Sequence, residues 1–190
     1  MKPQLWLLAG GNGAGKTTFY RQFLEPRAVL FANADEIARQ IDPASPEQHS
    51  YRAAQMVEHL RRQLLLERKS FCFETVFSHP SKIDFLAEAK SAGYEVILVI
   101  VHLESPALNQ ARVAQRVSEG GHAVPADKVV SRIPRTLENL RKALPLCDQV
   151  HVLDNSSASS PFERVAVLKA QVPVFLAEPL QEWVGELLGV

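Results

Sequence analysis

A dense group of glycines followed by a lysine and two threonines is the first part of this chain that could do chemistry. Four of the nine glycines stand at positions 10, 11, 13 and 15, between an apolar run at residues 4–9 and Lys16-Thr17-Thr18. This Gly-x-x-x-x-Gly-Lys-Thr spacing is that of a phosphate-binding loop. Glycines let consecutive backbone N–H groups point into one concavity, and a helix that starts at the lysine adds the positive end of its dipole. The pattern therefore predicts a binding site for ATP or GTP with Mg²⁺.

The residue types of this loop predict individual functions for Lys16 and Thr17. Lys16 is expected to reach the outer phosphates and to act in catalysis, and the Thr17 hydroxyl is expected to hold Mg²⁺. A glycine-rich turn without a ligand is the alternative, but an apolar strand before the loop and a helix after it favour the nucleotide site. The other expected nucleotide contacts are Gly10, Gly11, Asn12, Gly13, Ala14, Gly15 and Thr18.

The rest of the sequence indicates what is done with the nucleotide. Motor and transport ATPases usually have an apolar strand that ends in Asp-Glu, whereas the nearest candidate here ends at Asp154 without a following acid. The Asn-Lys-x-Asp motif with which GTPases read the base is missing from the sequence as well. A small-molecule kinase needs positive charge on the transferred phosphate and a carboxylate for the acceptor hydroxyl. The sequence offers both, which favours a kinase.

Two carboxylates follow predicted strands. Asp35, in Phe-Ala-Asn-Ala-Asp-Glu-Ile, is expected to act as the base that accepts or orients the proton of the acceptor hydroxyl. The alternative is that Asp35 caps the helix that follows, although Asn33 could be the cap instead. Glu74 and Thr75 stand at a strand tip, where Glu74 could hold substrate hydroxyls or a magnesium-bound water, or could be an exposed residue without a role. Asn33, Glu74 and Thr75 are the predicted substrate-binding residues of these segments.

Arginines in the second half of the chain could supply the positive charge. Arg112 and Arg116 are four residues apart and therefore share one helix face, from which they are expected to contact phosphates and act in catalysis. Glycines at 120 and 121 and a proline at 125 would let residues 112–135 close as a mobile flap over the phosphates, which also limits hydrolysis by water. Arg132 and His122 are predicted to contact substrate from this flap. The alternatives are a solvated helix face for the arginines and an ordinary turn residue for His122.

The alternation of strand-like and helix-like segments predicts the scaffold that positions these residues. We expect strands at residues 4–9, 28–31, 70–76, 94–103 and 149–154, and further extended structure at 164–178. Helices are expected at 16–25, within 31–42, at 45–68, 81–93, 105–118 and 125–144, with a kink at Pro134, and in the last ten residues. Such alternation predicts a parallel sheet covered on both faces, with the ligand site at the carboxyl ends of its strands.

Composition narrows the class of protein and its partners. The chain has 190 residues, of which 46% are hydrophobic and 22% charged, values typical of a globular protein with one domain at residues 1–190. Lys plus Arg and Asp plus Glu both number 21, so no overall charge attracts nucleic acid or an anionic membrane. The two cysteines match no metal spacing and are expected to be reduced thiols of a cytoplasmic protein. The apolar runs are too short for a signal peptide or a membrane span.

Taken together, the motifs resemble those of the zeta-toxin-like family of P-loop kinases. The segments that carry this resemblance are AGGNGAGKTT, FANADEIA, FETV, RVAQRVSEGGHAVPADKV, LENL and VLDNS, which lie between about residues 5 and 156. The resemblance implies an α/β P-loop NTPase fold of the nucleoside-kinase type, with a five-stranded parallel core sheet and helices on both faces. It also implies ATP with Mg²⁺ as the donor and, in the toxin members, the 3′-hydroxyl of UDP-N-acetylglucosamine as the acceptor. The positions that match the family's functional residues are Lys16, Thr17, Asp35, Glu74, Thr75, Arg112 and Arg116.

The leading hypothesis is therefore a cytoplasmic ATP-dependent phosphotransferase that acts on an alcohol group of a small molecule such as a nucleotide sugar. One alternative is an ATP-gated regulatory or interaction protein with little turnover. A nucleic-acid end kinase is a third, against which the zero net charge and the lack of an aromatic–basic platform argue. We expect neither a nucleic acid nor a membrane as partner, and the resemblance leaves room for an antitoxin that the sequence does not identify.

Overall fold

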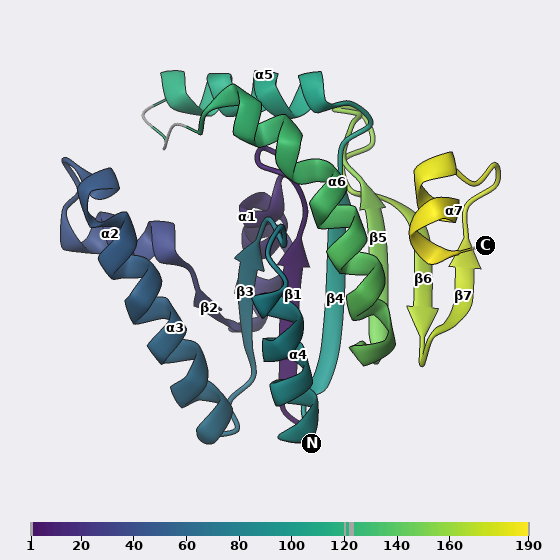
Figure 1. The fold of residues 1–190 in the computed structure, drawn as a ribbon, viewed down its shortest axis with the longest axis horizontal. Coiled ribbons are helices and arrows are strands. Elements are labelled where there is room, and N and C mark those ends of the chain that lie inside the picture. Colours follow the sequence, from purple (N-terminus) through teal and green to yellow (C-terminus); the bar gives the residue numbers. More distant parts are fainter. Residues whose placement is uncertain (1, 120, 122–123, 190) are drawn as a thin grey trace.

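Five parallel strands form the centre of the sheet in the computed structural model, which describes residues 2–119, 121 and 124–189. They are β1 (Gln4–Ala9), β2 (Leu30–Ala32), β3 (Phe71–Thr75), β4 (Glu95–His102) and β5 (Gln149–Asp154), in the spatial order β2-β3-β1-β4-β5. All but the end residues of β4 are buried, as its run of apolar residues on both faces predicts. This arrangement confirms the predicted fold class (Figure 1).

Two antiparallel strands extend the sheet, which therefore has seven strands among the described residues rather than the five predicted. β6 (Glu163–Lys169) pairs with β5, and β7 (Val172–Leu176) pairs with β6. A parallel return would need a long crossover connection, whereas only a short polar loop separates β5 from β6. Ala170 and Gln171 close the β6–β7 hairpin with φ of 47° and 67°, the left-handed conformation that two-residue hairpin turns use. The extended structure expected at 164–178 is this hairpin.

Helices cover both faces of the sheet. They are α1 (Lys16–Phe19), α2 (Ala34–Ile41), α3 (Ser50–Leu66), α4 (Ser81–Ser91), α5 (Pro106–Ser118), α6 (Ala126–Ala143) and α7 (Glu182–Leu188). α3, α4, α6 and α7 pack over the larger apolar core, to which Leu7 points, whereas α1 lies on the opposite face with a smaller core that contains Leu8 (Figure 1). Because side chains alternate along a strand, neighbouring residues of β1 serve the two cores.

The winding of one helix, the start of another and the start of one strand differ from the prediction. The helix expected at 16–25 is α1 followed by a wider turn at Tyr20–Leu24 and a tighter turn at Glu25–Arg27. Tyr20 stacks on Phe31 and donates its hydroxyl to the Val29 carbonyl, so side-chain packing accompanies this change in winding. β2 begins at Leu30 instead of residue 28, because Ala28 adopts a left-handed conformation with φ of 55°. The long helix begins at Ser50, after a tight turn at Pro46–His49.

Helix α6 connects the predicted flap to the body of the sheet. It continues through Pro134, and in Figure 1 its first part runs beside α5 before the helix turns along the sheet, in agreement with the predicted kink. Beyond the proline, Thr136 donates to the Val76 carbonyl at 2.7 Å and Asn139 donates to the Phe77 carbonyl at 3.0 Å. These bonds tie α6 to the loop that follows β3. Within the described residues, no helix has the length and apolar character needed to cross a membrane.

Candidate nucleotide and acceptor site

A cavity of about 640 Å³ opens at the carboxyl ends of the parallel strands, where the fold predicts a ligand site. Its walls come from the glycine loop and the first turns after it, the start of α2, the end of β3, and the facing sides of α5 and α6. Its volume falls within the range of small-molecule sites, about 300–1,000 Å³. The predicted site residues that line it are Asn12, Gly13, Gly15, Lys16, Thr17, Thr18, Asn33, Asp35, Glu74, Arg112, Arg116 and Arg132.

The glycine loop has a backbone that larger residues could not adopt. Gly13 and Gly15 have φ of 76° and 101°, in the left-handed region. A Cβ atom on Gly15 would lie 2.5 Å from Nδ2 of Asn155, and one on Gly13 would lie 2.8 Å from the Asn109 carbonyl oxygen. The glycines at 13 and 15 are therefore required by their neighbours as well as by their torsion angles, as expected for a phosphate-binding loop.

Lys16 occupies the floor of this cradle. Its Nζ donates to the carbonyl oxygens of Gly10 and Gly11, both at 2.9 Å, and the side chain is almost completely buried. Burial lowers the pKa of Lys16 and the charge of Arg116 lowers it further, whereas Glu74 and Asp35 oppose the shift. A partly desolvated ammonium group gains much from an anion, so Lys16 fits the phosphate-binding part that the sequence assigns to it.

Two buried asparagines hold the loop from outside, and sequence reasoning missed both. Asn109, on α5, donates from Nδ2 to the carbonyl oxygen of Asn12 at 2.7 Å. Asn155, directly after β5, donates from Nδ2 to the carbonyl oxygen of Ala14 at 2.8 Å and accepts from the N–H of Phe162 at 3.1 Å. Since these bonds occupy loop carbonyls on the outer side, they favour an orientation in which loop N–H groups face the cavity.

Glu74 is the centre of a small polar cluster with Thr17 and Asn33. Both Glu74 oxygens lie 2.9 Å from Oγ1 of Thr17, and Nδ2 of Asn33 donates to Oε1 of Glu74 at 2.9 Å. Mg²⁺ in phosphate-transfer sites is held by few protein oxygens together with waters and substrate phosphates. A hydroxyl and a carboxylate side by side next to the phosphate loop fit that requirement.

Asn33, and not Asp35, caps helix α2. Oδ1 of Asn33 accepts from the N–H groups of Asp35 at 2.7 Å and Glu36 at 3.2 Å, so Asn33 is the N-cap of α2. The carboxylate of Asp35 is not used as the cap; the residue is exposed and lines the cavity. Its side chain is therefore available to a substrate, as the base hypothesis requires.

The arginines form the opposite wall. Arg112 donates from Nη2 to the Asn155 carbonyl at 2.8 Å, and Arg132 donates from Nη1 to Oδ1 of Asn12 at 3.4 Å. Arg116 lies near enough to influence the pKa of Lys16. Three guanidinium groups thus surround the glycine loop from α5 and α6, in agreement with the predicted grouping although their roles stay predictions.

Two residues predicted to bind substrate are not among those that line the cavity. Thr75 lies outside it. The Thr75 hydroxyl accepts from the Phe77 N–H at 3.0 Å and so shapes the turn after β3. His122 lies outside the described residues. Val76 and Val124 line the cavity as apolar neighbours.

Four charged residues that the sequence analysis did not select also face the cavity: Arg21, Glu36, Arg39 and Glu119. Burial raises the pKa of Glu36, and the charges of Arg21 and Arg39 oppose that shift. Arg39 lies four residues after Asp35 on α2, and Arg21 lies four after Thr17, so each shares a helical face with a selected residue. That spacing could have identified the two arginines from the sequence.

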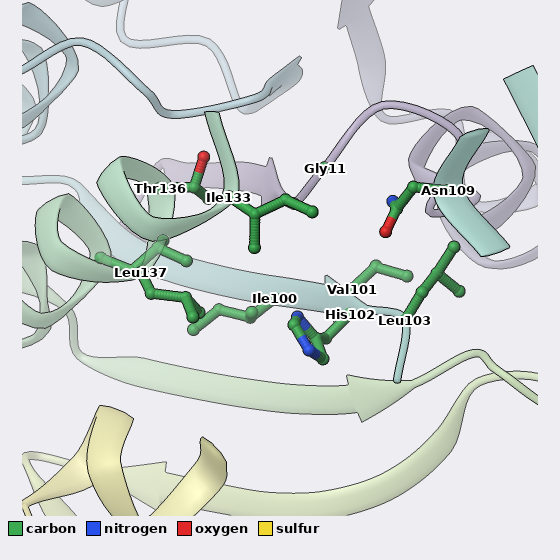
Figure 2. Close-up of a pocket in the computed structure, with 11 residues that line it drawn as sticks. Gly11, Ile100, Val101, His102, Leu103, Asn109, Ile133, Thr136 and Leu137 are labelled. Atoms are coloured by element: carbon green, nitrogen blue, oxygen red, sulfur yellow. The ribbon is translucent and has the colours of Figure 1, made fainter. Parts of the chain in front are cut away.

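A second, much smaller cavity lies beneath the glycine loop, as Figure 2 shows. Its volume of about 10 Å³ is enough for about one water molecule. His102 lines it and stacks on Trp183 with ring centroids 4.0 Å apart. Burial lowers the pKa of His102, and the nearby Asp154 opposes the shift. The other lining residues are Gly10, Gly11, Ile100, Val101, Leu103, Asn109, Ile133, Thr136, Leu137 and Leu140.

Comparison with known sequences agrees with this geometry. The family model described as Zeta toxin matches residues 1–164. An uncharacterized protein of Haemophilus influenzae is 29% identical over 139 residues, which are 70% of this chain and 99% of that protein. The family match at residues 1–164 therefore includes every residue that lines the larger cavity.

Solved structures share the fold. A chain from the complex of AvrRxo1-ORF1 and AvrRxo1-ORF2 with ATP matches 90% of this chain with a TM-score of 0.72 and 17% identity. The present chain covers 60% of that chain's length. A chain from the PezAT chromosomal toxin–antitoxin system of Streptococcus pneumoniae matches 100% of this chain and 88% of its own length, with a TM-score of 0.66 and 19% identity. At such identities these matches establish the fold alone.

Proposed function

Because the chain belongs to the zeta toxin family, we propose that it is an ATP-dependent kinase that phosphorylates a hydroxyl group of a small molecule. One observation carries this proposal. A single cavity contains the glycine loop with its buried lysine, the carboxylates of Asp35 and Glu74, and three arginines on the facing wall. Phosphoryl transfer needs these groups and little else, because its catalysis rests on positioning and on charge stabilisation.

Each group has a defined task in this reaction. The loop amides and Lys16 bind the phosphates, and Thr17 with Glu74 would hold Mg²⁺, which would neutralise charge on the phosphate oxygens. Asp35 accepts the proton of the acceptor hydroxyl while that oxygen bonds to the terminal phosphorus and the bond to the leaving ADP oxygen breaks. Arg112, Arg116 and Arg132 stabilise the negative charge of the transferred group.

The finer parts of the proposal follow from the resemblance and from the neighbours. A nucleotide sugar such as UDP-N-acetylglucosamine is the acceptor to test first, and Arg21 and Arg39 add positive charge near Asp35 that would suit an anionic acceptor. Residues 1–190 would act as one cytoplasmic kinase domain, with residues 112–135 as a flap. The PezAT neighbour is a toxin–antitoxin system by its description, which supports an antitoxin as a partner to search for.

Incubation with ATP, Mg²⁺ and a panel of nucleotide sugars, followed by mass spectrometry of the products, tests the activity. Asp35→Asn should slow transfer by about 10²–10⁴-fold with nearly unchanged ATP affinity, because the base is lost while the phosphate cradle stays intact. Asp84→Asn, on α4 outside the described cavity, is the matched control and should transfer at the rate of the parent. Equal rates for Asp35→Asn and the parent would refute the base assignment. ATP binding without transfer to any acceptor would favour the ATP-gated regulator instead.

A further inference from the structure

A short segment near the end of the chain contacts the ends of two neighbouring strands. Its residues are Gln181, directly before α7, and Trp183, in the first turn of that helix. Nε1 of Trp183 donates to Oε1 of Gln181 at 2.5 Å, and Nε2 of Gln181 donates to Oδ2 of Asp154 at 2.9 Å. The Trp183 ring stacks on His102, with ring centroids 4.0 Å apart. The segment therefore contacts the last residue of β4 and the last residue of β5.

The end of β4 lies directly against the first half of the glycine loop. A Cβ atom on Gly10 would lie 2.0 Å from the Val101 carbonyl oxygen, so no side chain fits between the loop and the strand. His102, the next residue, lines the small cavity together with Gly10 and Gly11 (Figure 2). The carbonyls of these two glycines accept the bonds from Lys16. A shift of this strand end would therefore also move the lysine.

The end of β5 supports the second half of the loop. Asp154 precedes Asn155, whose side chain donates to the Ala14 carbonyl at 2.8 Å. Oδ1 of Asp154 accepts from the N–H of Ser156 at 2.8 Å, which fixes the turn that contains Asn155. The N–H of Asn155 donates to the His102 carbonyl at 2.9 Å and so links the two strand ends. Both halves of the loop thus rest on strand ends that the C-terminal segment contacts.

We propose that Gln181 and Trp183 are positioning residues that keep the glycine loop in its ATP-binding conformation. This inference rests on the nucleotide site of the proposed function. Neither residue is among the described residues that line the larger cavity, so both act through the strand ends and not on the nucleotide itself. A loop that is already ordered binds its ligand more tightly, because less freedom is lost on binding. Both residues lie beyond residue 164, where the family match ends.

Helix α7 has other attachments, which allow this role to be separated from a purely structural one. Val184 and Leu187 are buried in the larger core, and Nη2 of Arg141 donates to the Glu186 carbonyl. These contacts hold α7 against α6 and the sheet without the Gln181 bonds. Loss of the Gln181 side chain should therefore leave the helix in place and release the strand ends.

Calorimetry with ATP and Mg²⁺ tests the proposal and needs no acceptor. Gln181→Leu removes both bonds of the amide and should raise the Kd for ATP about three- to tenfold, with the number of sites per chain unchanged. Trp183→Ala removes the ring from His102 and should act in the same direction. Gln63→Leu deletes an amide-to-carboxylate bond of equal length, 2.9 Å, on the exposed side of α3, and this matched control should bind like the parent.

The number of sites separates the possible outcomes. A variant with fewer sites and an unchanged Kd has lost folded protein only, and this result would overturn the proposal, as would a Gln181→Leu variant identical to the parent. If the parent itself binds no ATP, the nucleotide site of the proposed function is wrong, and this inference with it. A parent that binds ATP no better than Gln181→Leu overturns the inference alone.

An exchange of the two bonded groups tests the link itself. Gln181→Glu places two carboxylates side by side and should weaken ATP binding at least as much as Gln181→Leu. When it is combined with Asp154→Asn, the amide and the carboxylate have changed places, and the bonds to Ser156 and Trp183 can form again. The Kd of the double variant should return to within about twofold of that of the parent. A double variant as weak as Gln181→Glu would contradict the proposed link.

Hydrogen exchange without nucleotide supplies a local readout. Amides in the peptide of residues 10–18 should exchange faster in Gln181→Leu than in the parent, because the loop has lost its support, and Gln63→Leu should not differ from the parent. Equal exchange of this peptide in Gln181→Leu and the parent would overturn the proposal.

Discussion

Removal of the Asn155 side chain is the perturbation that most directly tests how the glycine loop is held. Asn155 is 7% exposed, and its amide bridges the Ala14 carbonyl and the Phe162 N–H. Asn155→Ala deletes both bonds and leaves the two backbone groups in a space that water enters poorly. Arg112 bonds to the Asn155 backbone carbonyl, so the contact from α5 is retained in the variant.

The expected loss follows from the two orphaned groups. An unsatisfied buried donor or acceptor costs about 1–3 kcal/mol, and the Phe162 N–H is only partly buried, so we expect a decrease of about 2–4 kcal/mol in the free energy of unfolding. A domain with about 5–15 kcal/mol of stability stays folded after such a loss. We also expect the variant to bind ATP about tenfold more weakly, because the loop is no longer fixed in its binding conformation.

Urea unfolding measures the free energy of unfolding, and calorimetry with ATP and Mg²⁺ measures the affinity for ATP. Ser159→Ala, at an exposed position of the same loop, is the control and should change neither quantity by much. Asn155→Asp should be at least as damaging as the alanine variant, since a carboxylate oxygen would then face the Ala14 carbonyl oxygen. If Asn155→Ala unfolds and binds ATP like the parent, the loop is not held in the way described.

Two other predictions concern the cation and the response to acid. Glu74→Gln should raise the Mg²⁺ concentration needed for tight ATP binding by about 10–100-fold, because the charge beside Thr17 is lost; a calorimetric Mg²⁺ titration that matches the parent would contradict this. Burial holds the pKa of His102 below its ordinary value of 6.5, so the unfolded chain binds the proton first. The free energy of unfolding should therefore fall as the pH drops below about 6.5. His102→Phe keeps an aromatic ring against Trp183 and should reduce that dependence in urea unfolding at pH 7 and pH 5.5; a variant with the pH dependence of the parent would contradict this.

Local patterns in the sequence were sufficient for the parallel core and the loop. The apolar runs that became β1, β3 and β4 predicted strands, because a strand buried on both faces requires such a run. The glycine loop was predictable because its chemistry depends on contiguous residues. The two additional strands, β6 and β7, were not predictable as a hairpin from apolar runs. Their pairing depends on a turn formed by Ala170 and Gln171, which are not typical turn residues.

The parts of the site that depend on distant contacts were not predictable. Asn155 and Ala14 are 141 residues apart in sequence, and Asn109 and Asn12 are 97 apart, so no local pattern links an amide to its carbonyl. The choice between Asn33 and Asp35 as helix cap was open for a different reason. Both residue types make good caps. The bond from Asn33 to Glu74 holds the asparagine side chain at the start of α2, and this contact between distant residues has no signal in the local sequence.

The attachment of α6 determines where a swing of its arginine-bearing end can begin. Thr136 and Asn139 clamp the helix to the backbone after β3, and Pro134 lacks the N–H that would otherwise bond to the Val130 carbonyl. We therefore expect the predicted flap, if it moves, to bend at the proline, so that the part of α6 that carries Arg132 changes position while the part from Thr136 onward keeps its bonds to Val76 and Phe77.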